Sequence, residues 1–355
     1  MPAQPSEQLA PEFRLRVDGT DLPATAAADV LEVAVLLDVS APSMFAVRLI
    51  NWDMEKLQVS WADDKLFAVG AEVEILMGYA GRLATVMVGE ITGLEPEFRA
   101  SEVPVVTVRG YDRRHRLMRG QKTRSFTQAK DSDIAARIAQ EAGLTAEVED
   151  TQTTLEYVLQ HNQTDLEFLT GRARRLGYEV SVDKKTLYFR PHANDKAEVL
   201  TLSRQSDLLE LCPRLSTVGL AGGVEVRGWS AKDKEGLLGQ SAAGDEGTTM
   251  GGKNGGLAVA DEAFGAAVAV SVDRPVLGAG EAGEMAAGRL KEMALFYVTG
   301  EGVAVGNTGI QAGTVVKIEG CGVRFSGLYY LPSVTHTWTS RKGYRTGFTL
   351  RRNAT

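Results

Sequence analysis

The sequence has 355 residues, 44% of them hydrophobic and 24% charged, which is typical of a globular protein and excludes wholesale disorder. A formal net charge of −7 argues against a polycation that binds DNA or anionic membranes through its overall charge. Two cysteines, Cys212 and Cys321, cannot form a disulfide framework and fit a reducing compartment. The N-terminus does not resemble a secretory signal and no apolar run is long enough for a membrane span. We therefore expect synthesis in the cytoplasm and no stable membrane insertion.

The first patterned tract is predicted to be a β-barrel over residues 12–125, after an N-terminal tail at 1–11. Phe13, Leu15 and Val17 alternate with polar residues before a turn at Gly19, as in a half-buried strand. Similar alternation predicts further strands at 31–39, 44–50, 73–77, 86–91 and 103–108. Six strands in about 100 residues favour a barrel or sandwich.

Residues 126–195 predict a small αβ module. A helix begins near Asp131 and stops at Gly143. Thr164 and Glu167 form a capping box for a second helix, which ends at Gly177. Two short strands, at 178–182 and 187–189, follow it.

The remainder predicts a second, interrupted β-barrel. Its first part is 196–235, with strands at 199–202 and 223–229, and its closing strands lie in 300–355. The intervening 236–299 is predicted to hold a glycine-rich loop and a helix at 281–298. Because 236–258 has few large apolar residues, we expect it to be mobile and dispensable for folding. The predicted fold class is thus mainly β with α+β insertions: two β-barrels and an αβ module.

The sequence contains none of the common catalytic or metal-binding motifs, so it predicts no catalytic, metal or cofactor site. The four histidines lie far apart, neither cysteine has a CxxC partner, and phosphate-loop and nucleophile-elbow motifs are absent. A peptidoglycan hydrolase remains an alternative, because two distant carboxylates can meet in a cleft. A carbohydrate-binding module is a further alternative, although it would need an exposed aromatic platform and we expect one or both of Trp52 and Trp61 to lie in the core.

A basic stretch, RRHRLMRGQKTR, is the strongest local charge feature. We define it by Arg113, Arg114, Arg116, Arg119, Lys122 and Arg124. Three interpretations are a solvated face, a nucleic-acid contact and an assembly interface with an acidic partner, and we favour the last. Reversing Arg113, Arg114, Arg116 and Arg119 to Glu is then expected to impair assembly and leave the fold intact.

Three segments together resemble one family. They are VTVRGYDRRHRLMRGQKTRSF (106–126), HNQTDLEFLTGRARRLGYEVSVDKKTLYFRP (161–191) and FSGLYYLPSVTHTWTSRKGYRTGFTLRRN (325–353). They look like the phage late control gene D family, which includes the baseplate hub of contractile tails and the hub region of type VI secretion spike proteins. The motif residues expected to specify this fold are Tyr111, Asp112, Thr164, Asp165, Leu166, Phe168, Gly177, Gly327, Tyr329, Gly343, Tyr344, Arg345 and Thr346.

The resemblance implies a non-enzymatic structural hub. Such a hub is a ring-shaped homotrimer whose six barrels match a six-fold inner tube to a three-fold spike and line a lumen. The implied partners are further copies of the chain, the inner tube or its initiator, baseplate wedge proteins and a spike. Because the sequence stops two residues after the last motif, we expect the spike either to be a separate chain or to have been removed from this one.

Overall fold

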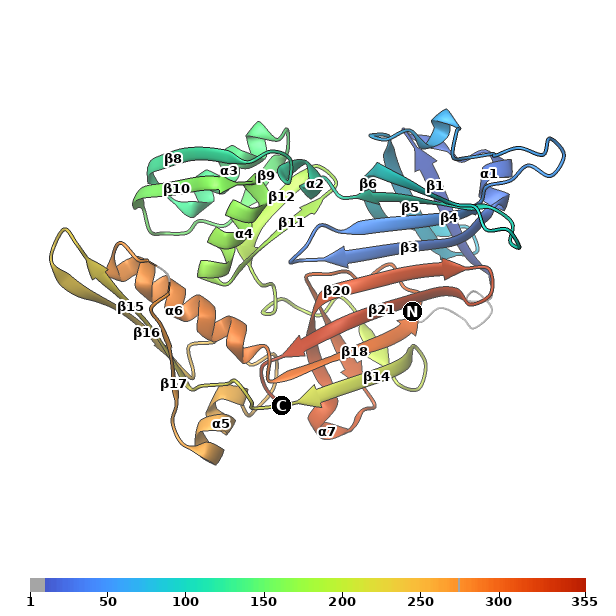
Figure 1. Ribbon diagram of the computed structural model, residues 1–355. Coiled ribbons are helices and arrows are strands. Elements are labelled where there is room, and N and C mark those ends of the chain that lie inside the picture. Colours follow the sequence, from blue (N-terminus) through green and yellow to red (C-terminus); the bar gives the residue numbers. More distant parts are fainter. Residues whose placement is uncertain (1–9, 274) are drawn as a thin grey trace.

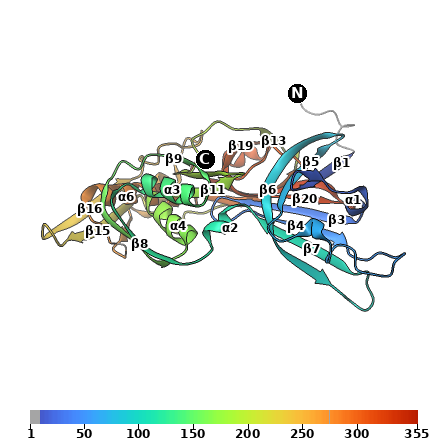
Figure 2. The ribbon, with the colours of Figure 1, turned by 90° about the horizontal axis from the view of Figure 1, so that it is seen from above.

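The computed structural model describes residues 10–273 and 275–355 and shows an elongated, mainly antiparallel β protein (Figure 1). Seen from above, the N-terminal strands form one end of the molecule, and the helices α3, α4 and α6 lie toward the other (Figure 2). Most of the predicted tail at 1–11 falls outside the described residues.

The N-terminal β region follows from alternating apolar residues. Leu15 and Val17 of the first strand are buried, as are Val33 and Val35 of the third, whereas the residues between them are less buried. Its strands are β1 (Pro11–Val17), β2 (Thr20–Asp21), β3 (Val30–Asp38), β4 (Met44–Ile50), β5 (Glu72–Tyr79), β6 (Arg82–Glu97) and β7 (Val105–Tyr111). Its short helices are α1 (Ala24–Ala28), the 3₁₀ helix η2 (Lys65–Phe67) and α2 (Arg114–Leu117).

The C-terminal β region continues the same sheet. It contains β13 (Thr201–Ser203), β14 (Leu208–Leu215), β18 (Val298–Val305), β19 (Thr314–Glu319), β20 (Gly327–Thr339) and β21 (Gly343–Arg352), with the short helix α7 (Gly322–Phe325). Because β20 pairs with β3 along Ser333–Thr339, the strand order runs β14-β18-β21-β20-β3-β4-β7-β6-β5-β1-β2.

The prediction of two separate closed barrels is therefore wrong in this form. Among the described residues no sheet closes by hydrogen bonds, and the two β regions share one 13-stranded sheet. Two separate barrels would each have to pair the backbone N–H and C=O groups of their own edge strands. Here β3 and β20 pair these groups with each other instead. β1 does approach β20 and β21, but through side chains: the rings of Phe13 and Trp338 lie 4.3 Å apart, and Trp338 Nε1 donates to the Pro11 carbonyl (3.2 Å).

The tract predicted as an αβ module folds around its own core, and it also contains three strands, β8 to β10, that the sequence did not predict. It contains β8 (Lys122–Ala129), α3 (Asp131–Glu141), β9 (Thr145–Val148), β10 (Leu155–Gln163), α4 (Asp165–Leu176), β11 (Tyr178–Asp183) and β12 (Thr186–Pro191). The capping box is confirmed, since Thr164 accepts from the Glu167 amide and the Glu167 carboxylate accepts from the Thr164 amide. Gly177 ends α4 with a left-handed φ of 67°.

The tract at 236–299 differs most from prediction. Glu235–Ala242 is strand β16, which pairs along its whole length with β15 (Gly223–Ser230), so the loop expected there is wrong. β15 lies apart from the large sheet, in a three-stranded sheet with β16 and β17 (Val268–Ser271). Helix α5 (Gly256–Phe264) follows, and α6 (Ala279–Ala294) covers the sheet (Figure 1). β16 has few large side chains, but it packs under α6 because Leu237 is buried and Gly239 lies against the backbone of Ala282.

Candidate functional site

Arg114 of the basic stretch is an internal residue. It is 1% exposed and forms an ion pair with Asp112, with Nε and Nη2 at 2.9 and 2.7 Å from the Asp112 carboxylate. The guanidinium also donates to the Val180 carbonyl (3.0 Å) in the αβ module and to the Asp38 carbonyl (2.8 Å) in the sheet. Arg114 therefore joins these two parts and presents no charge to a partner.

Most of the other cations in the stretch are neutralised within the chain. Glu90, itself 3% exposed, accepts from Arg116 (2.6 and 2.8 Å) and faces His115 and Arg113. Burial alone would raise the pKa of Glu90, but the hydrogen bonds from Arg116 and His115 outweigh it and lower the pKa. Lys122 and Arg124 both bind Asp165, at 2.6 and 2.9 Å.

Among the described residues, Arg119 is the one cation of the stretch without an ion pair, and its side chain is exposed. Reversing four arginines that include Arg114 would place a carboxylate in the buried site beside Asp112. We therefore expect this fourfold variant to lose stability, contrary to the prediction from the sequence.

The motif residues named from the sequence lie at separate places in the structure. Asp112 and Asp165 hold the pairs above, Tyr111 ends β7 opposite Glu90, and Leu166 and Phe168 pack in the module core, where Phe168 stacks on Phe126. In the last hairpin, Gly343 turns with a φ of 67° and Arg345 is exposed. Gly327 adopts a φ of 141° against the Arg352 guanidinium, and the buried Tyr329 donates to the Phe325 carbonyl (2.8 Å).

Tyr344 and Thr346 contact the side chain of His336. The sequence indicated no role for this histidine. His336 is fully buried; its Nδ1 accepts from the Tyr344 hydroxyl (2.7 Å) and its Nε2 donates to the Ile310 carbonyl (3.0 Å). Burial lowers the pKa of His336 to about 4 and raises that of Tyr344, so the imidazole is neutral and the phenol protonated. This network fixes the β20–β21 hairpin, away from solvent.

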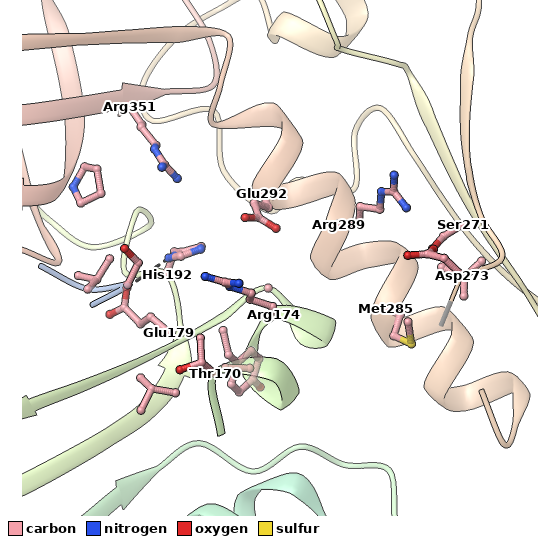
Figure 3. Close-up of a pocket in the computed structure, with 18 residues that line it drawn as sticks. Thr170, Arg174, Glu179, His192, Ser271, Asp273, Met285, Arg289, Glu292 and Arg351 are labelled. Carbon is pink, nitrogen blue, oxygen red and sulfur yellow. Dashed lines mark hydrogen bonds and ion pairs between the residues drawn. The ribbon is translucent and has the colours of Figure 1, made fainter. Parts of the chain in front are cut away.

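A cleft of about 560 Å³ lies between the αβ module, helix α6 and strands β20 and β21 of the large sheet (Figure 3). Glu179 on β11 is at its inner wall and is 4% exposed. Its carboxylate accepts from the Tyr330 hydroxyl on β20, from Arg190 (3.2 Å) and from His192 (3.2 Å). Burial raises the pKa of Tyr330 far above its usual value, so its hydroxyl remains a donor across this second joint between module and sheet.

Three further cations line the cleft: Arg174 on α4, Arg289 on α6 and Arg351 on β21 (Figure 3). Arg351 stacks over the Phe296 ring, 4.3 Å from its centre, and burial lowers its pKa. None of the three has a hydrogen bond or ion pair with a carboxylate of the described residues. No sequence signal marked these residues, because they come from elements far apart in the chain.

The described residues contain no group of three or more His, Cys, Asp or Glu placed to hold a metal ion. Trp52 and Trp61 are half-buried, and Trp61 Nε1 donates to Asp29 (2.8 Å). Among the described residues, no helix is both long and apolar enough to cross a membrane.

A family model described as the Alg8 N-terminal domain matches residues 7–340. The chain belongs to this family. A search of curated proteins finds no match to this member of the Alg8 N-terminal domain family.

Comparison with solved structures shows that this chain has the fold of tail proteins. The 43 kDa tail protein of prophage MuSo2 from Shewanella oneidensis matches with a TM-score of 0.70 at 13% identity, over 97% of this chain and 98% of that one. A tail protein from Neisseria meningitidis matches with a TM-score of 0.67 at 14% identity, over 97% and 96%. A component of the type VI secretion system of Escherichia coli matches with a TM-score of 0.61 at 14% identity, over 96% of this chain and 77% of that one.

Proposed function

We propose that the protein is a structural hub of a contractile phage tail or tail-like injection particle. The fold likeness to two tail proteins and a type VI secretion component, over nearly the whole chain, supports this proposal. The late control gene D resemblance adds the finer role: adapting a six-fold inner tube to a three-fold spike around a lumen. The protein would be made in the cytoplasm and assembled into the particle with tube, wedge and spike proteins.

The observation that carries the proposal is the shared sheet. The pairing of β3 with β20 joins the two β regions in one sheet, and β14 ends the sheet with an edge that pairs with no described strand. Leu209, on β14, is 49% exposed. An unpaired edge favours pairing with another chain, and a contact between unlike faces of identical chains closes into a ring. Two β regions in each of three chains would supply six similar units for a six-fold tube.

Stoichiometry tests the hub role. We expect mass photometry of the chain co-expressed with the spike from the same gene cluster to give three copies of the chain per complex. A permanent interface of this kind buries about 2,000 Å² or more, so the complex should persist on dilution. One, two or six copies would contradict the ring. A lytic zone in a zymogram of the purified chain would instead favour the peptidoglycan hydrolase alternative.

A further inference from the structure

The cleft between α4 and α6 is lined by three arginines, Arg174, Arg289 and Arg351, that form no ion pair with a described residue. Arg174 and Arg289 are exposed. The two neighbours of Arg174 on α4 are paired within the chain: Arg172 binds Asp131, and Arg175 binds Glu281. A guanidinium stays charged in proteins and forms its strongest contacts with carboxylates and phosphates.

The acids in the cleft do not supply that partner. Glu179 already accepts hydrogen bonds from Tyr330, Arg190 and His192. Asp273 accepts from the Ser271 hydroxyl (2.7 Å). Glu292 acts on Arg351 only through its charge, without a hydrogen bond among the described residues. A neutral hydroxyl leaves the charge of Asp273 in place, so the three guanidinium groups share the cleft with two carboxylates, Asp273 and Glu292. Among the described residues, neither carboxylate forms a hydrogen bond or ion pair with any of the three.

The shape of the cleft favours an extended ligand over a small anion. Figure 3 shows Arg174 and Arg351 on one side of α6, and Arg289 on the other side, toward Ser271 and Asp273, so the cations are spread along the cleft. The buried Met285 and Val226 give it apolar walls. Arg174 also lines a second cavity of about 510 Å³, where Tyr157, Leu159 and Leu277 are 49%, 46% and 58% exposed.

We propose that this cleft binds an acidic segment of a partner protein, an extended stretch in which carboxylate and apolar side chains alternate. The arginines would take the carboxylates, and Met285, Val226 and the exposed side chains around Arg174 would take the apolar residues. The inference concerns the single chain and does not depend on the hub role.

The test measures fluorescence anisotropy of a short labelled peptide in which Glu and Leu alternate, at constant ionic strength. The Arg174→Gln/Arg289→Gln variant should weaken binding about tenfold or more. A matched variant, Arg14→Gln/Arg341→Gln, removes two exposed arginines that have no ion pair among the described residues, and it should bind as the wild type does. Circular dichroism should be the same for all three proteins.

Four outcomes would overturn the proposal. The wild type does not bind the peptide, or both variants lose affinity equally, which indicates attraction by overall charge. A peptide in which Gln replaces Glu binds equally well, which indicates an apolar groove only. Inorganic phosphate displaces the peptide at unchanged ionic strength, which indicates a small-anion site.

Discussion

Single buried charges determine how the αβ module is attached. Arg114 donates to Asp112, to the Asp38 and Val180 carbonyls and to the Ser43 hydroxyl, so one side chain satisfies acceptors in both the sheet and the module. Removing one partner from a buried ion pair leaves the other charge uncompensated, which costs far more than losing a surface pair.

Arg114→Gln should therefore lower the free energy of unfolding by about 3–5 kcal/mol, measured by urea denaturation. Arg119→Gln is the matched control, since Arg119 lies five residues away, is exposed and has no ion pair with a described residue. We expect this control to change stability by about 0.5 kcal/mol or less. Equal effects of the two variants would contradict the assigned role of Arg114.

His336 predicts a pH dependence of stability. Its pKa falls from 6.5 to about 4 on folding because of burial, so the unfolded chain binds a proton in this range that the folded chain does not. Stability from this residue is complete above pH 6.5 and is lost as the pH falls toward 4, by about 3 kcal/mol. His336→Gln, compared with the wild type by urea denaturation across this range, should show a shallower fall. Parallel curves would contradict the depressed pKa.

Sequence reasoning found the charges of the basic stretch but not their partners. Glu72, Glu90 and Asp165 lie far from Arg113, Arg116 and Arg124 in sequence, and only the folded chain brings them together. A run of like charges in sequence is thus no guide to the charge on the surface. His336 gave no signal either, because its partners belong to a hairpin and a loop that meet only on folding.

At the level of elements, two glycines set how closely α6 packs on α4. A Cβ on Gly288 would lie 2.4 Å from the Leu176 carbonyl carbon, and one on Gly177 would lie 2.8 Å from the Gly288 carbonyl oxygen. The two backbones touch here, and the Arg175–Glu281 pair holds the same crossing. This contact positions α6, and with it Arg289, on one wall of the cleft.

Gly288→Ala should force the helices apart and destabilise the protein by about 1–3 kcal/mol, measured by urea denaturation. Gly283→Ala on the same helix is the control, because its Cβ would meet nothing within 4 Å. Helix propensity predicts that this second variant is stabilised by up to about 1 kcal/mol. The same sign for both variants would refute the close crossing.

Local patterns predicted local elements well and distant pairings poorly. The Thr164 capping box and the Gly177 stop are short-range signals, and α4 begins and ends where they predict. β16 was missed because its stability comes from the fit of Leu237 and Gly239 under α6, about 40 residues later in the chain. The β3–β20 pairing joins strands almost 300 residues apart, and no alternation pattern specifies such a partner.

At the scale of the whole molecule, two joints hold the αβ module against the sheet. Arg114 forms one, and the Glu179–Tyr330 hydrogen bond between β11 and β20 forms the other. The cleft opens beside the second joint, so the position of the module sets its width. The Glu179 carboxylate is buried, and losing the Tyr330 hydroxyl leaves it with only Arg190 and His192 as side-chain partners.

Tyr330→Phe should loosen the module without unfolding the sheet, because it removes one hydrogen bond to a buried charge, worth about 1.5–3 kcal/mol. Hydrogen exchange should accelerate at the amides of β11 and β12 and remain unchanged in β4 and β7. Tyr329→Phe is the matched control: Tyr329 is equally buried, but its hydroxyl donates to the Phe325 carbonyl within the C-terminal β region. Faster exchange of β11 in both variants, or in neither, would show that the Glu179–Tyr330 bond does not hold the module in place.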